Sequence, residues 1–475
     1  MSQAWKDRHI VILNWRDLDH PQSGGAEVFA ERIAERLSAS GARVTVVAAR
    51  PKGLPGRSHR GGFTIIRFGG TFGVYPCALV WLAAHRRIVD AVIDCQNGIP
   101  FFSPLAVRRR TPVLQVIHHV HQRQFGLFFS PFAAAVGRQL EGRGSRAVYR
   151  RRPSVSVSPS TRREVREVLK LRGPRHLVTN GLELPQPAAL ATRSETPTIV
   201  CVGRLAAHKR IHLLLEAIPL IAEAVPNLRV HLIGDGPDGP RLQEIAKNLS
   251  LSPEVLVWHG RVGTAERDGL VARGWLTVNP TIGEGWGIGV LEAASFGLPT
   301  VAFAVPGVRD SVRDGQTGWL IDEGGDLAGA VAAALRLLAD PRVAKNYRIA
   351  CLAWAAEFSW ERSADLISTL LIAEHCWRQL GRRERRRVDD EGALVHLSGV
   401  GTTGLGLRAT DLIFPAKDSH SILLPGADAA GARNALERAN GSASHRSPTA
   451  IRIEPATEDD FLMAAVTGRS ARAVG

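Results

Sequence analysis

Short runs of β-branched and aliphatic residues alternate with longer amphipathic segments along most of the chain. After the first apolar run, a Gly-Gly loop leads into a helical pattern over 26–40. Strands of the first half are predicted at 9–15, 43–49, 63–68, 91–95, 112–118, 154–158 and 176–179. Such alternation of strands and helices is typical of a parallel sheet with helices on both faces. The first half, residues 1–184, is therefore predicted to be a doubly wound α/β domain.

The alternation of strands and helices is interrupted in the middle of the chain and resumes after it. Residues 185–197 are rich in Pro, Ala and Thr without periodicity, which indicates a linker. Beyond it a helical pattern covers 211–224, and strands are predicted at 198–204, 228–234, 255–260, 275–280, 299–304 and 318–321. A second doubly wound domain is therefore predicted over 198–358. Two such domains bind ligands outside the carboxyl ends of their strands.

The remaining chain has a different character. Residues 359–378 have the pattern of one long helix, which we expect to cross back to the first domain. Residues 379–475 are richer in Gly, Ser and polar turns. Strands are predicted there at 409–414, 420–426 and 449–455, with a helix over 428–439. We expect this extension to be a small, mobile β/α appendage of unknown role.

Composition narrows the class of protein. The chain has 475 residues, 45% hydrophobic and 22% charged, which excludes wholesale disorder. Its 5 cysteines are scattered without metal-binding spacing, so neither a disulfide framework nor a metal site is expected. No apolar run approaches the length of a membrane span or a signal peptide. The expected compartment is the cytoplasm.

Positive charge is concentrated in the first half. The formal net charge is +15, and residues 1–190 alone hold 29 Lys and Arg against 12 Asp and Glu. Arginine runs at 108–110 and 150–152 suggest either a solvated surface or an anionic partner. An anionic membrane surface or a phosphorylated lipid acceptor fits such a partner, whereas no aromatic–basic interleaving points to nucleic acid. We therefore expect no nucleic-acid partner.

The strongest chemical pattern lies in the second half. VGRLAAHKR (202–210) places Arg204 and Lys209 in one loop after a strand. TIGEGWGIGVLEAASFGLPTVA (281–302) places Glu284 and Glu292 on either side of a Gly-rich turn that opens a helix. Two cations and a helix start can hold a diphosphate, and carboxylates accept hydrogen bonds from sugar hydroxyls. The pattern therefore indicates a nucleotide-sugar site.

These residues resemble the retaining glycosyltransferases of family 4, which have the GT-B fold of two Rossmann-like domains facing a cleft. The resemblance rests on the GR…K loop and the Glu-x7-Glu signature at Glu284 and Glu292. In the first half it includes SGGAE (23–27), VIHHVH (116–121), VSPSTRREV (157–165) and TNGLE (179–183). The segment around VIHHVH also resembles actinobacterial cell-envelope members.

The resemblance implies roles for residues of the second half. Arg204 and Lys209 would bind the donor diphosphate and stabilise the charge of the leaving group. Glu284 would contact the hydroxyls of the donor sugar, and Glu292 would hold the ribose hydroxyls. The backbone at Gly287 and Ile288 would contact the sugar and the phosphates. The competing interpretation is a solvated helix face for the two carboxylates, and a surface charge pair for Arg204 and Lys209.

In the first half, the resemblance implies that Gly24 and Gly25 let a loop approach the phosphates closely. The competing interpretation of this pair is a helix-entry turn. His118 matches the family's histidine near the reacting sugar, but the adjacent His119 is an open alternative. Asn180 is read as part of a tight hinge turn, with ligand contact as the alternative.

The expected activity is transfer of a hexose from a nucleoside-diphosphate sugar to an acceptor hydroxyl, with retained configuration. The acceptor is expected to be a lipid-linked or cell-envelope glycan intermediate. Asp17 and Asp19 mimic a metal-binding pair, yet the family's chemistry is metal-independent, so neither a metal nor a cofactor is expected. The competing interpretation is a sugar-nucleotide-binding regulator without turnover.

Overall fold

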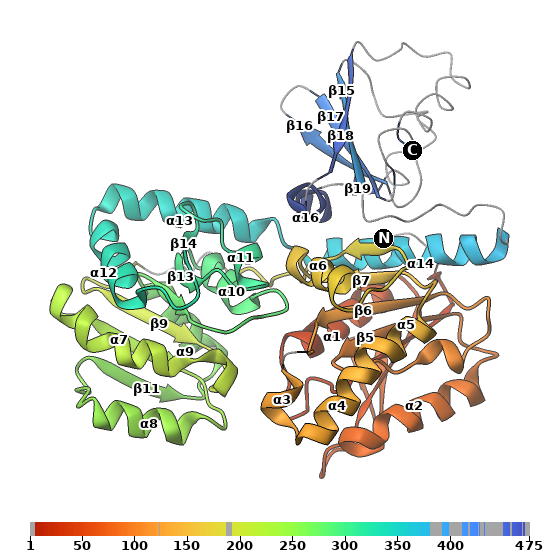
Figure 1. The fold of residues 1–475 in the computed structure, drawn as a ribbon, viewed down its shortest axis with the longest axis horizontal. Helices are drawn as coiled ribbons and strands as arrows, with labels where there is room; N and C mark the ends of the chain where they lie inside the picture. The colour runs from red at the N-terminus through yellow and green to blue at the C-terminus, as the bar shows by residue number, and fades with distance from the viewer. Residues whose placement is uncertain are drawn as a thin grey trace. The chain divides into compact units, whose positions relative to one another are not determined.

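The chain forms two compact units, coloured by residue number in Figure 1. The computed structural model describes residues 5–122, 124–186, 192–380, 392–398, 411–416, 419–425, 427, 432, 450–456, 458–467 and 469–470. One unit comprises residues 1–181 and 359–475, and the other comprises 182–358. The segment interpreted as a linker, 185–197, thus falls in the second unit, and its residues 187–191 lie outside the described ones.

The first unit is built on an eight-stranded sheet in the order β3-β4-β2-β1-β5-β6-β7-β8. Every pairing is parallel except that of β3 with β4. The strands are β1 (His9–Leu13), β2 (Arg43–Ala49), β3 (Arg57–Arg60), β4 (Phe63–Phe68), β5 (Ala91–Asn97), β6 (Val113–His119), β7 (Ser154–Ser156) and β8 (Arg175–Leu177). The aliphatic strands β1, β2, β5 and β6 are buried almost throughout, as helices on both faces require.

Helices cover the two faces of this sheet (Figure 1). They are α1 (Gly25–Ala39), α2 (Gly70–His85), α3 (Phe125–Phe128), α4 (Pro131–Gln139), α5 (Ser145–Val148), α6 (Pro159–Glu167) and α14 (Trp360–Leu380). On one face Phe29 of α1 packs edge-on against Trp360 of α14, with ring centroids 6.2 Å apart. On the other, Val74 and Leu82 of α2 join Tyr149, which follows α5, in one core cluster. Helices α2 and α5 therefore share a face.

The second unit contains two three-stranded parallel sheets, β11-β10-β9 and β12-β13-β14, joined by a bridge between Ile199 and Leu276. The strands are β9 (Thr198–Val202), β10 (Arg229–Ile233), β11 (Leu256–Gly260), β12 (Thr277–Asn279), β13 (Thr300–Phe303) and β14 (Gly318–Ile321). The helices are α7 (Ile211–Ala224), α8 (Gly239–Asn248), α9 (Thr264–Arg273), α10 (Ile288–Ser295), α11 (Val308–Ser311), α12 (Leu327–Leu338) and α13 (Pro341–Ala356). The predicted α/β fold of two doubly wound domains is confirmed.

The chain passes between the two units at 181–182 and again at 358–359, and these two connecting segments run side by side. Leu182 donates its amide to the carbonyl of Phe358 (3.1 Å), and Ser363 donates its hydroxyl to the carbonyl of Thr179 (2.7 Å). A Cβ on Gly181 would lie 2.3 Å from the Trp360 nitrogen. Glycine is therefore required at 181 by the close approach of two backbones.

The extension folds as an antiparallel sheet in the order β18-β15-β17-β16-β19. Its elements are β15 (Gly392–Ser398), β16 (Leu412–Ala416), β17 (Ser419–Pro425), β18 (Ala450–Pro455), α16 (Glu458–Thr467) and β19 (Arg469–Ser470). The Arg162 guanidinium of α6 lies over the Phe461 ring of α16 at 3.7 Å, and Arg362 donates to the Ala464 carbonyl at 2.8 Å. The helix predicted over 428–439 lies, apart from Ala432, outside the described residues.

None of the helices that the structure describes combines the length and the apolar character that crossing a membrane requires.

Candidate functional site

A pocket in the second unit contains three of the donor-site residues expected from the sequence, namely Arg204, Lys209 and Glu284. It lies at the carboxyl ends of β9 and β12 and reaches the start of α10, and its lining includes Arg204, Lys209, Asn279, Glu284 and Gly289. Strand ends bring these residues together because all the strands of this unit run parallel. The pocket therefore has two cations, one carboxylate and a helix start in its wall.

An ion pair joins the two sides of the pocket. The Lys209 Nζ lies 2.5 Å from the Glu284 Oε1, and both side chains are partly exposed. The Asn279 Nδ2 donates to the same oxygen at 3.3 Å. Burial alone would raise the pKa of the Glu284 carboxyl, but the Lys209 charge and hydrogen bond outweigh burial and hold that pKa below its ordinary value. Glu284 is thus a charged acceptor.

The backbone of the Lys209 loop is tied to the loop before Glu284. The carbonyl of His208 accepts hydrogen bonds from Thr281 Oγ1 and from the amide of Ile282, each at 3.0 Å. Arg210 donates to the carbonyls of Pro280 and Thr281, each at 2.8 Å. These contacts fix the position of Lys209 relative to Glu284. Sequence reasoning missed the part played by His208 and Arg210, although both stand in the AHKR run.

The start of α10 depends on a glycine with left-handed backbone. Gly287 is the N-cap with φ 76°, and a Cβ there would lie 2.6 Å from the Ser311 hydroxyl oxygen. The first amides of a helix lack partners within the helix and attract anions. Ile288 is the first residue of α10, and Glu292 is exposed on the same helix, outside the lining of the described pocket. Lys209 therefore forms its ion pair with Glu284, while its charge also acts on Glu292.

In the first unit, Gly24 and Gly25 stand where β1's loop meets α1. The Gly24 amide donates to Glu27 Oε2 at 2.7 Å, and Arg16 Nε holds the other carboxylate oxygen of Glu27 at 3.2 Å. Gly24 has φ −157°, which any residue adopts, and a Cβ there would meet nothing closer than that Oε2 at 3.6 Å. Gly24 is the N-cap of α1, a position at which glycine is common, and neither its backbone nor its packing excludes other residues.

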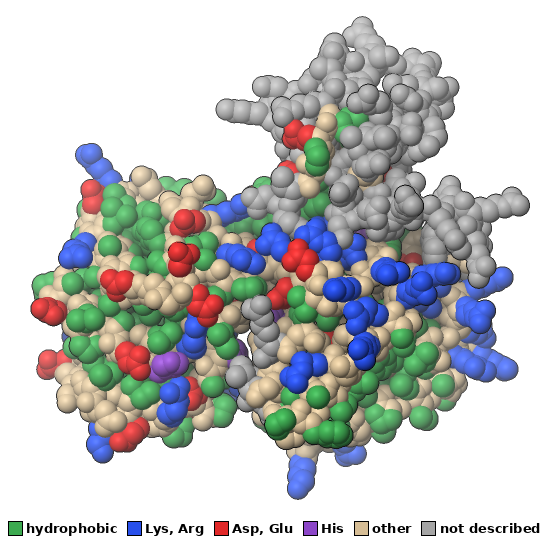
Figure 2. Space-filling view, in the orientation of Figure 1, with side chains coloured by type: hydrophobic (Ala, Val, Ile, Leu, Met, Phe, Trp, Pro, Cys, Tyr) green, Lys and Arg blue, Asp and Glu red, His purple; other side chains and the backbone are tan. Residues whose placement is uncertain are grey.

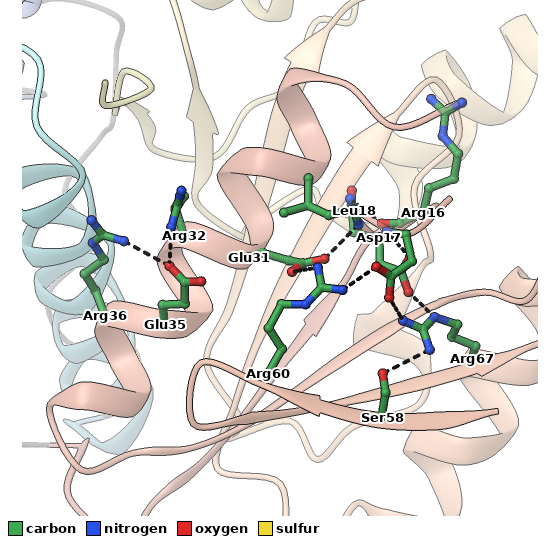
Figure 3. Close-up of polar contacts among 12 residues, drawn as sticks. Arg16, Asp17, Leu18, Glu31, Arg32, Glu35, Arg36, Ser58, Arg60 and Arg67 are labelled. Carbon is green, nitrogen blue, oxygen red and sulfur yellow. Dashed lines mark hydrogen bonds and ion pairs between the residues drawn. The ribbon is translucent and has the colours of Figure 1, made fainter. Parts of the chain in front are cut away.

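The loop between β1 and α1 is held by a network of arginines and carboxylates, shown in Figure 3. The buried Arg67 pairs with Asp17 and, at 2.7 Å, with Asp19. Arg60 pairs with Asp19 and, at 3.0 Å, with Glu31. Both Asp17 and Asp19 therefore form ion pairs with arginines, and these ion pairs hold the loop in position.

The two adjacent histidines of β6 have different environments. His118 is 6% exposed and lies edge-on to Phe29 of α1, with ring centroids 5.0 Å apart. Burial lowers its pKa to about 3, so its ring is neutral, and its Nε2 has no hydrogen-bond partner among the described residues. His119 is half-buried and lies 2.8 Å from the Gln124 amide nitrogen. The pairing of β5 with β6 shifts register at this point, with Gln96 opposite Ile117 and Asn97 opposite His119, so His118 has no partner residue on β5.

Further polar residues gather at the carboxyl ends of β1, β5 and β6. Asn97 donates to Asn14 Oδ1 at 3.1 Å, and Asn97 pairs in register with His119. The buried Glu141, in the π-helical turn Leu140–Gly144, accepts from the His121 amide at 2.7 Å. Burial raises the pKa of Glu141 to about 7. Sequence reasoning missed this cluster, although polar residues ending consecutive strands are a signal for one.

Asn180 is buried beside the connecting segments, and its Oδ1 has no hydrogen-bond partner within the described part of the chain. A buried carbonyl oxygen without a partner is a costly feature. The structure is compatible with either expectation for Asn180, a hinge turn or a ligand contact.

Two family models match the chain. Residues 23–185 match Glycosyltransferase Family 4, and residues 196–340 match Glycosyl transferases group 1. The GDP-mannose-dependent alpha-(1-6)-phosphatidylinositol monomannoside mannosyltransferase of Mycolicibacterium smegmatis is 27% identical over 397 residues, which are 77% of this chain and 97% of that relative. A D-inositol 3-phosphate glycosyltransferase of Thermomonospora curvata is 32% identical over 208 residues, 41% of this chain and 45% of that protein.

Solved structures of other proteins have the same fold as this chain. A sucrose-phosphate synthase from Thermosynechococcus elongatus has a TM-score of 0.65 at 19% identity and covers 77% of this chain and 98% of that one. The crystal structure of a glycosyltransferase from Rickettsia africae has a TM-score of 0.57 at 15% identity and covers 78% and 98%. With residues 23–185 and 196–340 matched by these two family models, the chain belongs to the family 4 glycosyltransferases, and the solved structures show that its fold is GT-B.

Proposed function

We propose that this glycosyltransferase moves a hexose from a nucleoside-diphosphate sugar to the hydroxyl of a lipid-linked cell-envelope intermediate, with retention of configuration and without a metal. The observation that carries the proposal is the Lys209–Glu284 pair in a pocket that also holds Arg204 and the start of α10. Such a site combines cations for a diphosphate with a carboxylate for sugar hydroxyls.

In the second unit, each part of the donor (diphosphate, sugar and ribose) has a candidate binding residue. Arg204 and Lys209 would bind the diphosphate, with the first amides of α10 at Ile288 and Gly289 adding anion affinity. Glu284 would accept hydrogen bonds from the sugar hydroxyls, since its lowered pKa keeps it charged. Glu292 would reach the ribose, for which its exposed position leaves room.

Retention follows from attack on the same face as the departing phosphate. The acceptor oxygen forms the new bond to the anomeric carbon as the bond to the diphosphate oxygen breaks, and the acceptor's proton passes to that leaving phosphate. No protein base is required in this step. The arginine and lysine stabilise the negative charge that develops on the leaving group.

In the first unit, His118 would act near the reacting sugar as a neutral ring. Its Nε2 and the side-chain oxygen of Asn180 have no hydrogen-bond partner among the residues that the structure describes. The M. smegmatis relative is named for GDP-mannose and for a phosphatidylinositol mannoside, which makes GDP-mannose and an inositol lipid the first substrates to test. The proposal includes a cytoplasmic location, where nucleotide sugars are available.

The experiment that tests the proposal compares Glu284→Ala with the wild type in transfer and in nucleotide binding. Because Glu284 would touch the transferred sugar and not the diphosphate, transfer should fall by about a hundredfold or more while nucleoside-diphosphate binding stays within a few-fold. The control variant is Glu254→Ala, which removes an exposed carboxylate outside the lining of the pocket. Equal loss of binding and transfer in Glu284→Ala would refute the role given to this residue. A protein that binds the nucleotide sugar but never turns it over would support a regulator instead.

A further inference from the structure

Glu141 is a buried carboxylate of the first unit that the proposed transfer does not yet use. It is 0% exposed and lies in the π-helical turn Leu140–Gly144, between α4 and α5. The outer surface of these helices carries hydrophobic and basic side chains (Figure 2), whereas the Glu141 carboxylate contacts the turn that follows β6. Burying a carboxylate costs free energy unless hydrogen bonds compensate for the lost water. The partners of Glu141 therefore indicate what the residue does.

Three groups donate hydrogen bonds to this carboxylate. Its Oε1 accepts from the His121 amide at 2.7 Å, and its Oε2 accepts from the Gln122 Nε2 at 2.7 Å. The side chain of Gln96, near the carboxyl end of β5, donates a third hydrogen bond. Both oxygens of Glu141 must therefore act as acceptors, which a carboxylate allows and the amide of a glutamine does not.

The helix that carries Glu141 approaches the turn after β6 closely. Gly137 lies four positions before Glu141, so the two residues share a face of the helix. A Cβ on Gly137 would lie 2.6 Å from the ring of Phe125, which leaves room only for glycine. The π-helical turn follows directly, and such turns are frequent at functional sites.

The turn held by Glu141 directly follows the two histidines of β6. The His121 Nδ1 lies 3.0 Å from the His119 carbonyl oxygen, and the two rings are 5.1 Å apart. The His121 carbonyl accepts from the amides of Gln124 and Phe125 at 2.8 and 3.0 Å, and the Gln124 side chain in turn contacts His119 at 2.8 Å. Holding His121 in place therefore also fixes the surroundings of His119.

From these contacts we propose that Glu141 is a positioning residue for the transfer reaction. Its carboxylate holds the turn after β6, and that turn anchors the end of the strand with His118 and His119. The inference rests on the proposed function, because it requires one of these histidines to act near the reacting sugar. Glu141 is fully buried and acts through the turn, without contact to either substrate.

The charge of Glu141 links this role to pH. Burial raises the pKa of Glu141 to about 7, although its three hydrogen bonds oppose that shift. The other titratable groups acting on it are the His121 ring, whose Nδ1 lies 3.9 Å from Oε1, and Glu164 of α6. Arg138 and Arg143 are the charged residues beside it on its own helix. Below pH 7 the carboxyl gains a proton, so one oxygen becomes a donor and one contact with the turn is lost.

The experiment compares Glu141→Gln with the wild type in the full chain. GDP-mannose is the donor probe, and phosphatidylinositol in phosphatidylcholine vesicles is the acceptor probe. Glutamine keeps the size of the side chain but offers one acceptor oxygen, as the protonated carboxyl does. The kcat/KM for the lipid should fall roughly tenfold or more, because orientation of the reacting groups is lost. Affinity for GDP should stay within about twofold, because the pocket of the second unit is unchanged.

The pH profile separates positioning from a merely structural role. Between pH 6 and pH 8 the wild type should gain about tenfold in kcat/KM for the lipid, as Glu141 loses its proton. Glu141→Gln should lack this rise. His121→Gln removes the neighbouring titratable ring but keeps the backbone amide that Glu141 binds, so this variant should retain the rise. A rise that persists in Glu141→Gln would overturn the proposal.

A matched control is Glu374→Gln on α14. Glu374 is also a buried carboxylate of the first unit, and it pairs at 3.3 Å with Arg152, which precedes β7 and so lies toward the amino ends of the strands. This variant should lower the free energy of unfolding and leave the transfer kinetics unchanged. Equal loss of transfer in Glu374→Gln and Glu141→Gln would overturn the proposal, because general destabilisation would then explain both.

Hydrogen exchange provides a readout that needs no acceptor. Peptides covering residues 113–122 should exchange faster in Glu141→Gln than in the wild type or in Glu374→Gln, because the His121 amide loses its acceptor. Unchanged exchange in Glu141→Gln would overturn the proposal. If the wild type transfers no sugar, the transferase proposal and the role of Glu141 in it both fail. Faster exchange in Glu141→Gln would then show that the failure lies in the proposed function and not in the contact.

Discussion

At the scale of the residue, the strand β6 gives two neighbouring histidines opposite surroundings. His118 packs against Phe29 in the core, whereas His119 joins Gln124 at the strand's end. The sequence VIHHVH is apolar on both sides of the pair, so no periodicity could distinguish them. Packing of α1 against β6, a contact between distant segments, decides which ring is buried.

Burial of His118 predicts a pH dependence of stability. Its pKa is about 3 in the folded chain, against an ordinary 6.5. Between these values the unfolded chain binds a proton that the folded chain does not, so the free energy of unfolding falls as the pH falls below 6.5. The loss is about 1.4 kcal/mol for each pH unit.

Urea unfolding of the wild type and of His118→Gln at pH 7 and pH 5 measures this effect. The wild type should lose about 2 kcal/mol more than the variant between these two conditions. His59→Gln, a change at an exposed histidine, should follow the wild type. Identical pH dependence in the wild type and His118→Gln would show that His118 is not the buried neutral group described above.

At the scale of the element, two glycines at the start of α10 allow an effect on stability to be distinguished from an effect on nucleotide binding. Gly287 has φ 76° and no room for a Cβ beside the Ser311 hydroxyl, whereas a Cβ on Gly289 would meet nothing closer than 3.9 Å. Gly287→Ala should therefore destabilise the second unit by about 1–3 kcal/mol. Gly289→Ala should leave its stability within about 1 kcal/mol and weaken nucleotide binding, because Gly289 lines the pocket.

Thermal unfolding and nucleotide titration of both variants provide the comparison. A Gly289→Ala variant that binds nucleotide as well as the wild type would place the donor away from the α10 start. Loss of stability in Gly289→Ala but not in Gly287→Ala would contradict the backbone argument.

Elements with a clear period could be predicted from the sequence. The runs at 43–49, 63–68 and 318–321 are strands with those bounds, and 211–224 is a helix with those bounds. Helix α2 was not predicted, because apolar residues surround its axis and leave no amphipathic pattern. The strand predicted at 154–158 ends at Ser156, because Ser158 caps α6 by accepting from the Thr161 amide.

The candidate site, too, could be predicted only in part from the sequence. Arg204, Lys209 and Glu284 could be identified because each follows a strand within a short motif. Glu141 could not, since its burial depends on a π-helical turn that brings it to the His121 amide. Asp17 and Asp19 stood out in the sequence as an Asp-x-Asp pair, but only the fold reveals that Arg67 is their partner.

At the scale of the whole molecule, the two units have separate cores, and the pocket belongs to the second. A nucleotide that binds there should stabilise that unit first. Bound at a hundredfold excess over its dissociation constant, it should add about 2.7 kcal/mol to the unfolding free energy of that unit. Hydrogen exchange should slow most at residues 203–210 and 284–295, and the extension at 392–470 should not respond. Protection confined to residues 5–181 would show that the nucleotide binds elsewhere.

The most direct measurement is calorimetric titration of the full chain with GDP, UDP and ADP in EDTA, with Lys209→Ala beside the wild type. We predict that one of the three nucleotides binds without metal, and that Lys209→Ala weakens it roughly tenfold or more, because a cation is lost from the diphosphate site. Binding that requires added Mg²⁺ or Mn²⁺, no binding of any of the three, or equal affinity in Lys209→Ala would contradict the account.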